Sequence, residues 1–456
     1  MGYGIRIALK ALRGAIVPLC LPFAAAALVF TSSASQADTG VKETVLWTFS
    51  GSPDGDSPYA AVIADERGAL YGTTGYGGSL GNGTVFKLTP PIVFQTGWKE
   101  DVLYSFSGGS DGCNPYAELF ARTESPLPSA RLYGTTSFCG ASGNGTVFRV
   151  TDHTLTTLWT FTGGSDGASP AAALVADEET GALYGTTYAG GGASGSGTVF
   201  KIDPADQTLN TIWTFSGDDG ANPMGRLLAD DSEALYGTTA GGGKSGAGVV
   251  FKLTPPARGQ TGWTRTVLYS FCTQPNCSDG AGPFFAGLIA DESGALYGTT
   301  AGGGSNNCFG GCGTVFRLTP PGDHKTAWKL TTLWTFTGGS DGALPSAPLI
   351  ADEKGALYGT TERGGVPTPV CFFGACGVVF KLTPPARGQT VWTETVLWSF
   401  SGGSDGGNAD AGLSADETGA LYGTTQFGGN VSNPQGPCSN YGCGVVFKLT
   451  GTGFAR

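Results

Sequence analysis

The sequence predicts an all-β protein, a seven-bladed β-propeller with four antiparallel strands in each blade. The pentapeptide Leu-Tyr-Gly-Thr-Thr occurs seven times, at intervals of 51 to 64 residues, and three other short tracts recur in step with it. All four tracts are rich in β-branched and aromatic residues and are bounded by Gly, Pro, Asp or Ser, as strands joined by tight turns are. Four-stranded sheets around an axis bury both faces, which explains why both faces of these tracts carry apolar side chains.

Each unit supplies its four strands in a fixed order. The first tract reads Leu or Ile, aromatic, Thr or Ser, Phe, as in Leu46–Phe49. The second is an apolar run that usually follows Pro and ends in Asp, as in Pro58–Asp65, and the pentapeptide is the third. The fourth reads Gly-Thr/Val-Val-Phe-Lys/Arg, as in Gly83–Lys87. Because the second and third tracts are separated by segments as short as Asp65–Gly68, we expect hairpins and an up-and-down sheet.

The phase of the repeat predicts a closed ring. The first tract opens the repeat region at 44–50, and the region ends with a fourth tract at 444–450. If the first tract is the outermost strand, the N-terminal strand completes the last blade, whose other strands come from about 409–450. An open solenoid would instead leave two unpaired edges. The recurring aromatic residues are then expected to pack between blades.

The first 37 residues have the order of a signal peptide. Arg6, Lys10 and Arg13 precede an apolar run over 15–30 and a stretch of small residues that ends at Ala37. The alternative is an uncleaved anchor, for which the run is short. We therefore expect residues 38–456 to form the propeller of a secreted or periplasmic protein without a membrane span. The chain has 25 basic and 36 acidic residues, which disfavours nucleic acid as a partner.

The cysteine count also indicates export. Of eleven cysteines, one lies at position 20 in the apolar run, and an even number remains, as disulfides in an exported chain require. The expected pairs are Cys113–Cys139, Cys272–Cys277, Cys308–Cys312, Cys371–Cys376 and Cys438–Cys443, with Cys277–Cys308 plus Cys272–Cys312 as an alternative. A zinc site is the other reading, but paired Cys-x-x-Cys spacing and nearby His ligands are missing. We expect no metal and no cofactor.

The motifs resemble those of a known repeat family. Asp-x-x-Gly-x-Leu-Tyr-Gly-Thr-Thr, a Gly-rich loop, Gly-x-Val-Phe-Lys-Leu-Thr-Pro and Leu-Tyr/Trp-Ser/Thr-Phe-x-Gly-Gly-x-Asp-Gly follow one another through 44–450. This arrangement resembles the GloVer tandem-repeat proteins of exported bacterial origin and, more distantly, the NHL and regulator-type propellers. The resemblance implies the fold, but it brings no activity and no catalytic residues to transfer.

Two repeated or scarce residue types bear on chemistry. An Asp-Gly pair precedes the second tract in every unit, at Asp54, Asp111, Asp166, Asp219, Asp279, Asp341 and Asp405. These carboxylates could bind calcium, but Asp-Gly is also a natural turn pair, and its presence in every unit favours the turn. The chain has only two histidines, His153 and His324, too few for a histidine-based catalytic centre, so we name no catalytic residue. A carboxylate pair of the glycosidase type stays open.

Positions where the repeat loses its uniformity predict a ligand site. Tyr59, Tyr116, Met224, Phe284 and Asp410 occupy one position of the second tract, and Glu118 and Arg226 occupy another. We expect Tyr59, Tyr116, Glu118, Arg226 and Phe284 to line the mouth of the central channel. The expected function is a monomeric binding or scaffold module for a glycan or another extracytoplasmic protein. The alternative is a propeller hydrolase or lyase that acts on a polysaccharide.

Overall fold

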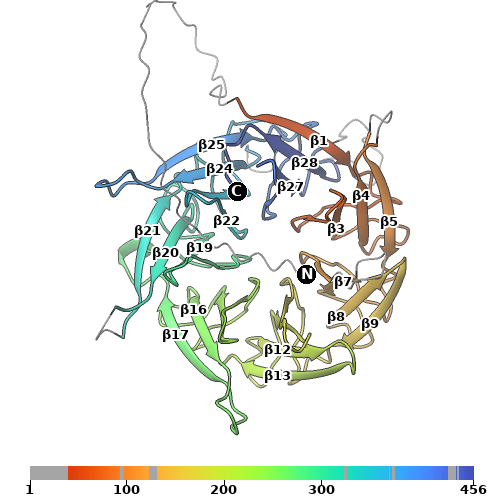
Figure 1. Ribbon diagram of the computed structural model, residues 1–456, viewed down its shortest axis with the longest axis vertical. Coiled ribbons are helices and arrows are strands. Elements are labelled where there is room, and N and C mark those ends of the chain that lie inside the picture. Colours follow the sequence, from red (N-terminus) through yellow and green to blue (C-terminus); the bar gives the residue numbers. More distant parts are fainter. Residues whose placement is uncertain are drawn as a thin grey trace, which may run out of the picture.

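The computed structural model describes residues 40–92, 97–122, 131–322, 326–368, 370–371, 375–429, 438 and 441–456. Seven four-stranded antiparallel sheets stand around a central axis, as predicted (Figure 1). The expected signal peptide, its cleavage after Ala37, and His324 lie outside the described residues. Within those residues, no helix is long and apolar enough to cross a membrane.

The strands of each blade run from the axis outward. Blade 1 contains β2 (Ile63–Ala64), β3 (Leu70–Thr74), β4 (Thr84–Thr89) and β5 (Lys99–Ser105); blade 2 contains β6 (Phe120–Arg122), β7 (Arg131–Thr136), β8 (Thr146–Thr151) and β9 (Thr154–Thr160). Blade 3 contains β10 (Val175–Ala176), β11 (Leu183–Thr187), β12 (Thr198–Asp203) and β13 (Thr208–Thr214); blade 4 contains β14 (Leu228–Ala229), β15 (Leu235–Thr239), β16 (Val249–Thr254) and β17 (Thr264–Ser270).

The remaining blades follow the same order. Blade 5 contains β18 (Ile289–Ala290), β19 (Leu296–Thr300), β20 (Thr314–Thr319) and β21 (Lys329–Thr335); blade 6 contains β22 (Ile350–Ala351), β23 (Leu357–Thr360), β24 (Val378–Thr383) and β25 (Thr393–Ser399). Blade 7 contains β26 (Ser414–Ala415), β27 (Leu421–Thr425), β28 (Val445–Thr450) and, as its outer strand, β1 (Lys42–Thr48). One short 3-10 helix, η1 (Pro275–Cys277), follows β17.

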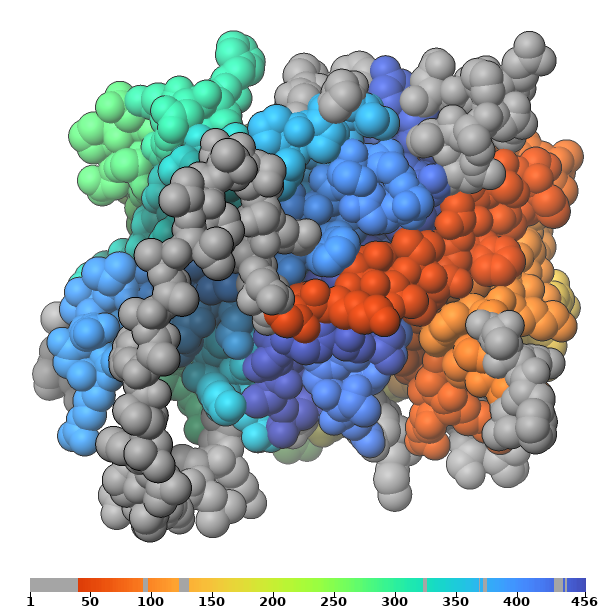
Figure 2. All heavy atoms as spheres, turned by 90° about the horizontal axis from the view of Figure 1, so that it is seen from above, coloured from red at the N-terminus to blue at the C-terminus, as the bar shows by residue number. Residues whose placement is uncertain are grey.

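The N-terminal strand closes the ring, as the repeat phase predicts. β1 pairs antiparallel with β28, from Lys42 opposite Thr450 to Thr48 opposite Val445. Figure 2 shows the red residues of β1 lying directly against the blue C-terminal residues. A second contact closes the ring near the axis, where the Thr424 hydroxyl of blade 7 donates to the Ala60 carbonyl of blade 1 at 2.9 Å.

The inner strands are shorter than the second tract of the repeat. In blade 1 only Ile63 and Ala64 join the ladder, although the apolar run begins at Pro58. The residues before β2 leave their own sheet and bond to the neighbouring blade, as Ala60 does with Thr424. The same threonine-to-carbonyl bond joins five other blade pairs, Thr73 to Ala117, Thr135 to Ala172, Thr238 to Ala286, Thr299 to Ala347 and Thr360 to Ala411.

The core consists of seven apolar clusters, one at each interface between adjacent blades. Each cluster contains a pair of edge-to-face phenylalanines, such as Phe49 and Phe86, whose ring centroids are 5.1 Å apart. The glycine of the pentapeptide lies beneath this pair, because a Cβ at Gly72 would come within 2.6 Å of Phe86 Cζ. The recurring first- and fourth-tract aromatics therefore pack between blades, as expected.

Loops between the third and fourth strands also bridge blades. The ring of Trp263, in the loop between β16 and β17, lies 6.1 Å from Tyr184 of the preceding blade. Residues 451–456 do the same for blade 6: Phe454 lies 5.0 Å from Tyr358, and the Glu353 backbone N–H donates to the Ala455 carbonyl at 3.0 Å. The chain after β28 thus replaces the tryptophan-bearing loop of other blades.

Candidate functional site

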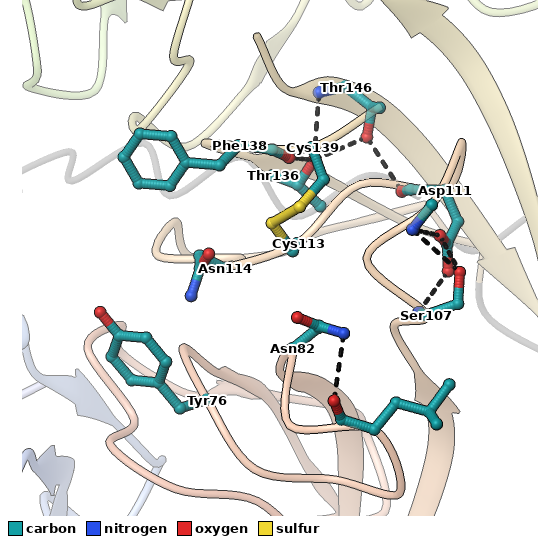
Figure 3. Close-up of a disulfide and its surroundings, with 12 residues drawn as sticks. Tyr76, Asn82, Ser107, Asp111, Cys113, Asn114, Thr136, Phe138, Cys139 and Thr146 are labelled. Carbon is teal, nitrogen blue, oxygen red and sulfur yellow. Dashed lines mark hydrogen bonds between the residues drawn. A yellow bond between two sulfur atoms is a disulfide. The ribbon is translucent and has the colours of Figure 1, made fainter. Parts of the chain in front are cut away.

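One face of the ring carries two sets of loops, the Asp-Gly links before the inner strands and the Gly-rich loops after the third tract. In every blade a short β-bridge joins the two, as between Asp56 and Tyr76 or between Cys113 and Phe138. We call this the loop face. In blade 2 the Cys113–Cys139 disulfide ties the link to the loop, with a Cα separation of 5.3 Å (Figure 3).

The Asp residues of the Asp-Gly links are structural. Asp111 is buried and accepts hydrogen bonds from the Ser107 backbone N–H at 2.7 Å and from the Tyr104 hydroxyl at 3.0 Å. Gly112 follows with a φ of +94°, which favours glycine. Asp166 and Asp219 accept equivalent bonds from a backbone N–H and a tryptophan ring. These carboxylates cap turns, which is the reading that the sequence favoured.

The aspartates that end the second tract are structural as well. Asp65 accepts hydrogen bonds from two backbone N–H groups of its hairpin and from the Tyr71 hydroxyl, and Lys87 lies over the Tyr71 ring. The same Asp, Tyr and cation arrangement recurs in blades 4 to 7, as at Asp416, Tyr422 and Lys448. In blade 3, Lys201 bonds to Asp177 and lies over the Tyr184 ring, without the tyrosine-to-aspartate bond. These interactions hold each hairpin against its own third strand.

Aromatic side chains gather on the loop face between blades 1 and 2. Tyr59 and Tyr116 contact edge to face with ring centroids 4.8 Å apart, and the Tyr116 hydroxyl donates to the Tyr76 hydroxyl at 2.8 Å. Phe138 joins at 6.5 Å from Tyr116. We call Tyr59, Tyr76, Tyr116 and Phe138 the tyrosine cluster. Tyr76 and Phe138 are 40% and 47% exposed, so the cluster presents ring surface and hydroxyl groups to solvent.

The local backbone positions these rings. Tyr59 and Tyr116 both lie over Gly75, where a Cβ would come within 2.7 Å of the Tyr116 ring. The Asn114 amide donates to the Gly75 carbonyl at 2.9 Å and fixes the blade 1 loop against the blade 2 link. Burial raises the pKa of Tyr59 to about 12, so its hydroxyl stays protonated. Tyr59 and Tyr116 were among the site residues predicted from the sequence, whereas Tyr76 and Phe138 were not.

Glu118 and Arg226 form an ion pair between two blades that are not adjacent. Arg226 Nη1 lies 3.2 Å from Glu118 Oε2, although one residue comes from blade 2 and the other from blade 4. At the equivalent position the other blades carry Ala61, Ala173, Gly287, Pro348 and Gly412, which are small enough to leave room for the two long side chains. Burial raises the pKa of the Glu118 carboxyl, and the Arg226 guanidinium opposes that rise. Phe284, the fifth predicted residue, is 43% exposed and packs on Gly282 of its own blade.

A polar group that the predicted site omitted adjoins the tyrosine cluster. Asp410 of blade 7 occupies the position of Tyr59, and its Oδ1 is buried without a hydrogen-bond partner. Burial, with the nearby Glu362 carboxylate, raises the pKa of Asp410 to about 8. Glu362 in turn accepts a bond from Arg363 at 3.0 Å. The Asp410 carboxylate also contributes to the raised pKa of Tyr59, because its negative charge opposes ionisation of the hydroxyl. A carboxylate inside an otherwise apolar tract was the available sequence signal.

The ten cysteines of the repeat region form five disulfides, Cys113–Cys139, Cys272–Cys277, Cys308–Cys312, Cys371–Cys376 and Cys438–Cys443. These are the pairs expected from the sequence, without the swap. Among the described residues, the one group of potential metal ligands is Asp56 with Cys438 and Cys443, whose sulfurs are bonded to each other. A surface hollow of about 460 Å³ beside Thr48, Phe49 and Ser50 lies by the outer strand, away from the residues of the predicted site.

The fold and the loop face define an up-and-down propeller closed by its N-terminal strand, with an aromatic and polar channel mouth. The chain belongs to the family described as the Gloeobacter/Verrucomicrobia repeat, whose model matches residues 102–310 and 234–455. No curated protein matches the chain significantly.

Solved propeller structures are similar at low identity. A protein assigned to the gluconolactonases is 15% identical, with 70% of this chain and 89% of that chain covered and a TM-score of 0.36. A chain of a nidogen/laminin complex is 14% identical, with 73% and 98% covered and a TM-score of 0.38. An oxidoreductase of Thermus thermophilus, assigned as a glucose dehydrogenase, is 14% identical, with 90% and 100% covered and a TM-score of 0.39. None of these likenesses bears on what the chain binds.

Proposed function

We propose that this protein is an exported glycan-binding module whose site is the tyrosine cluster on the loop face. The observation that carries the proposal is the contact of Tyr59, Tyr76 and Tyr116, three tyrosines from two blades that share one solvent-facing surface. Five disulfides support an exported protein, because such bonds persist in oxidising compartments.

The chemistry of the cluster suits a sugar ring. The C–H faces of a sugar stack on aromatic rings, while its hydroxyls need donors and acceptors such as tyrosine O–H groups. Apolar surface with a few placed polar groups is the usual composition of a small-molecule site. Gly75 and the Asn114 amide hold the rings in place before any ligand binds, which lowers the entropy lost on binding.

A glycan array on the purified protein, followed by calorimetry with the best binder, tests the proposal. Tyr116→Ala and Tyr76→Ala are each expected to weaken binding about tenfold or more, because each removes a stacking ring and one side of the hydroxyl pair. Tyr188→Ala is the matched control, since Tyr188 is also 40% exposed on the loop face but contacts no ring of the cluster that the structure describes. Full affinity in both cluster variants would contradict the site, and an array without binders would contradict glycan recognition.

A second candidate function rests on Asp410 and Glu362. The pKa of Asp410, raised to about 8, keeps this carboxyl group protonated near neutral pH, and the Glu362 carboxyl lies 3.0 Å from Arg363 Nε. A pair of carboxyl groups can cleave a glycosidic bond when one protonates the leaving oxygen and the other activates water.

A polysaccharide hydrolase panel tests the second candidate. If cleavage occurs, Asp410→Asn is expected to reduce it at least about a hundredfold, because the amide has no proton to transfer, and activity should fall above about pH 8 as Asp410 ionises. Glu66→Gln, at an exposed hairpin, is the control and should leave activity unchanged. Cleavage that survives Asp410→Asn would place the reaction elsewhere.

A further inference from the structure

The second residue of each outer strand points at the preceding blade. Arg265 in β17 shows where this position leads: its Nε lies 3.3 Å from Asp219 Oδ2, and its guanidinium lies over the Trp213 ring at 5.6 Å. Asp219 is the link aspartate that follows the outer strand of blade 3. The position therefore meets the capping carboxylate and the aromatic donor of the blade before it.

Three blades carry glutamate at this position, so that two carboxyl groups face each other between blades. The geometry of Arg265 and Asp219 directs Glu43 at Asp405, Glu100 at Asp54 and Glu394 at Asp341, and in each pair the aspartate charge acts on the glutamate. We call Glu43, Glu100 and Glu394 the seam glutamates. The Oε1 atom of each one is buried and has no hydrogen-bond partner.

We call each interface between neighbouring blades a seam. The hydrogen bonding of the aromatic donors differs between the three seams with glutamate and the other four. At the three glutamate seams, the ring N–H groups of Trp398, Trp47 and Trp334 are buried and have no partner. At the other four seams, the second residue of the outer strand is Leu or Arg instead of Glu. There the indole N–H or the tyrosine hydroxyl donates to the link aspartate, in the pairs Tyr104–Asp111, Trp159–Asp166, Trp213–Asp219 and Tyr269–Asp279. Glutamate thus coincides in all three cases with an incomplete hydrogen-bond network.

A bound cation would not complete this network, because the indole N–H is a donor and its positive edge repels a cation. A second anion would be repelled by the carboxylates. We propose that each of the three seams holds one proton between its two carboxyl groups, and that the ring of blades is therefore most stable in mild acid. The glutamate takes this proton from solvent, its O–H donates to the facing aspartate, and its other oxygen can accept from the indole.

The titration of the seam glutamates agrees with this arrangement. Burial, with the facing Asp405, raises the pKa of Glu43 from 4.5 to about 7. Burial and Asp341 do the same for Glu394, and burial with Asp54 and Asp101 does so for Glu100. A carboxyl group whose pKa is higher in the folded state takes up a proton on folding, so its stabilisation is complete below pH 4.5 and is lost as pH rises through about 7.

Thermal unfolding of the full propeller at about pH 5 and about pH 8, with a chelator present, tests the proposal. The unaltered protein is expected to melt about 5 °C or more higher at the lower pH. The triple variant Glu43→Gln, Glu100→Gln, Glu394→Gln should melt higher than the unaltered protein at the higher pH. Each glutamine amide N–H can donate to the facing aspartate without taking up a proton from solvent. Its difference between the two pH values should fall by at least about half. The pKa of Asp410 is also raised, so part of the dependence of the melting temperature on pH should remain in the triple variant.

The exposed hairpin glutamates provide a matched control. Glu66→Gln, Glu292→Gln, Glu417→Gln removes the same three charges from the surface and should keep the full difference between the two pH values. If the seam triple variant does not fold, the single variants Glu100→Gln and Glu394→Gln are measured in the same way. An unchanged pH difference in the seam variants would overturn the proposal. So would a rise in melting temperature with millimolar calcium that the seam variants abolish, because the seams would then hold a cation.

Discussion

Deletion of residues 38–52 is expected to abolish cooperative folding of the propeller. Without β1, blade 7 loses its outer strand and the ladder to β28, and the edge of β28 becomes exposed. The deletion also removes Leu46 and Phe49, which are buried at the interface of blades 7 and 1. Circular dichroism should show a melting temperature lower by more than about 10 °C, or no transition, because one of seven equivalent interfaces is opened.

A chain that begins at Gly40 keeps β1 whole and provides the control for this deletion. A synthetic peptide of residues 40–52, added to the deleted protein, should restore part of the transition if pairing with β28 is the cause. An unchanged melting temperature after the deletion would show that the ring does not depend on β1.

Phe251→Ala is expected to cost about 3–5 kcal/mol in the free energy of unfolding. Phe251 is fully buried between blades 3 and 4, where its ring lies 5.1 Å from Phe215. The cavity cannot collapse easily, because Gly237 beneath the ring and the Phe215 ring both belong to rigid sheets. Urea denaturation followed by tryptophan fluorescence measures the change.

Phe309→Ala is the matched control, since the Phe309 side chain is fully exposed at a loop tip. It should change the free energy of unfolding by less than about 0.5 kcal/mol. A loss below about 1 kcal/mol for Phe251→Ala would mean that the interface can repack, contrary to the close packing described above.

Much of the candidate site could be foreseen, but not its pairings. Tyr59, Tyr116, Glu118 and Arg226 were all predicted at the channel mouth from the loss of uniformity in the repeat. The structure divides them into an aromatic contact and an ion pair between residues 108 positions apart. Asp410 was recognised as a departure from the repeat, whereas its nearness to Glu362 depends on where the loop of the neighbouring blade lies.

The sequence by itself determined the number of blades, the order of strands and the closure of the ring. The physical reason is that strand periodicity, turn residues and phase are local properties, and seven repeats of them admit one way to pair all edges. The close cysteine pairs followed from loop length in the same way. The tertiary structure alone decided the extent of the inner strands, the assembly of the tyrosine cluster and the facing of Glu43 with Asp405. These are contacts between neighbouring blades, and their geometry depends on how the sheets tilt around the axis rather than on any residue's own repeat.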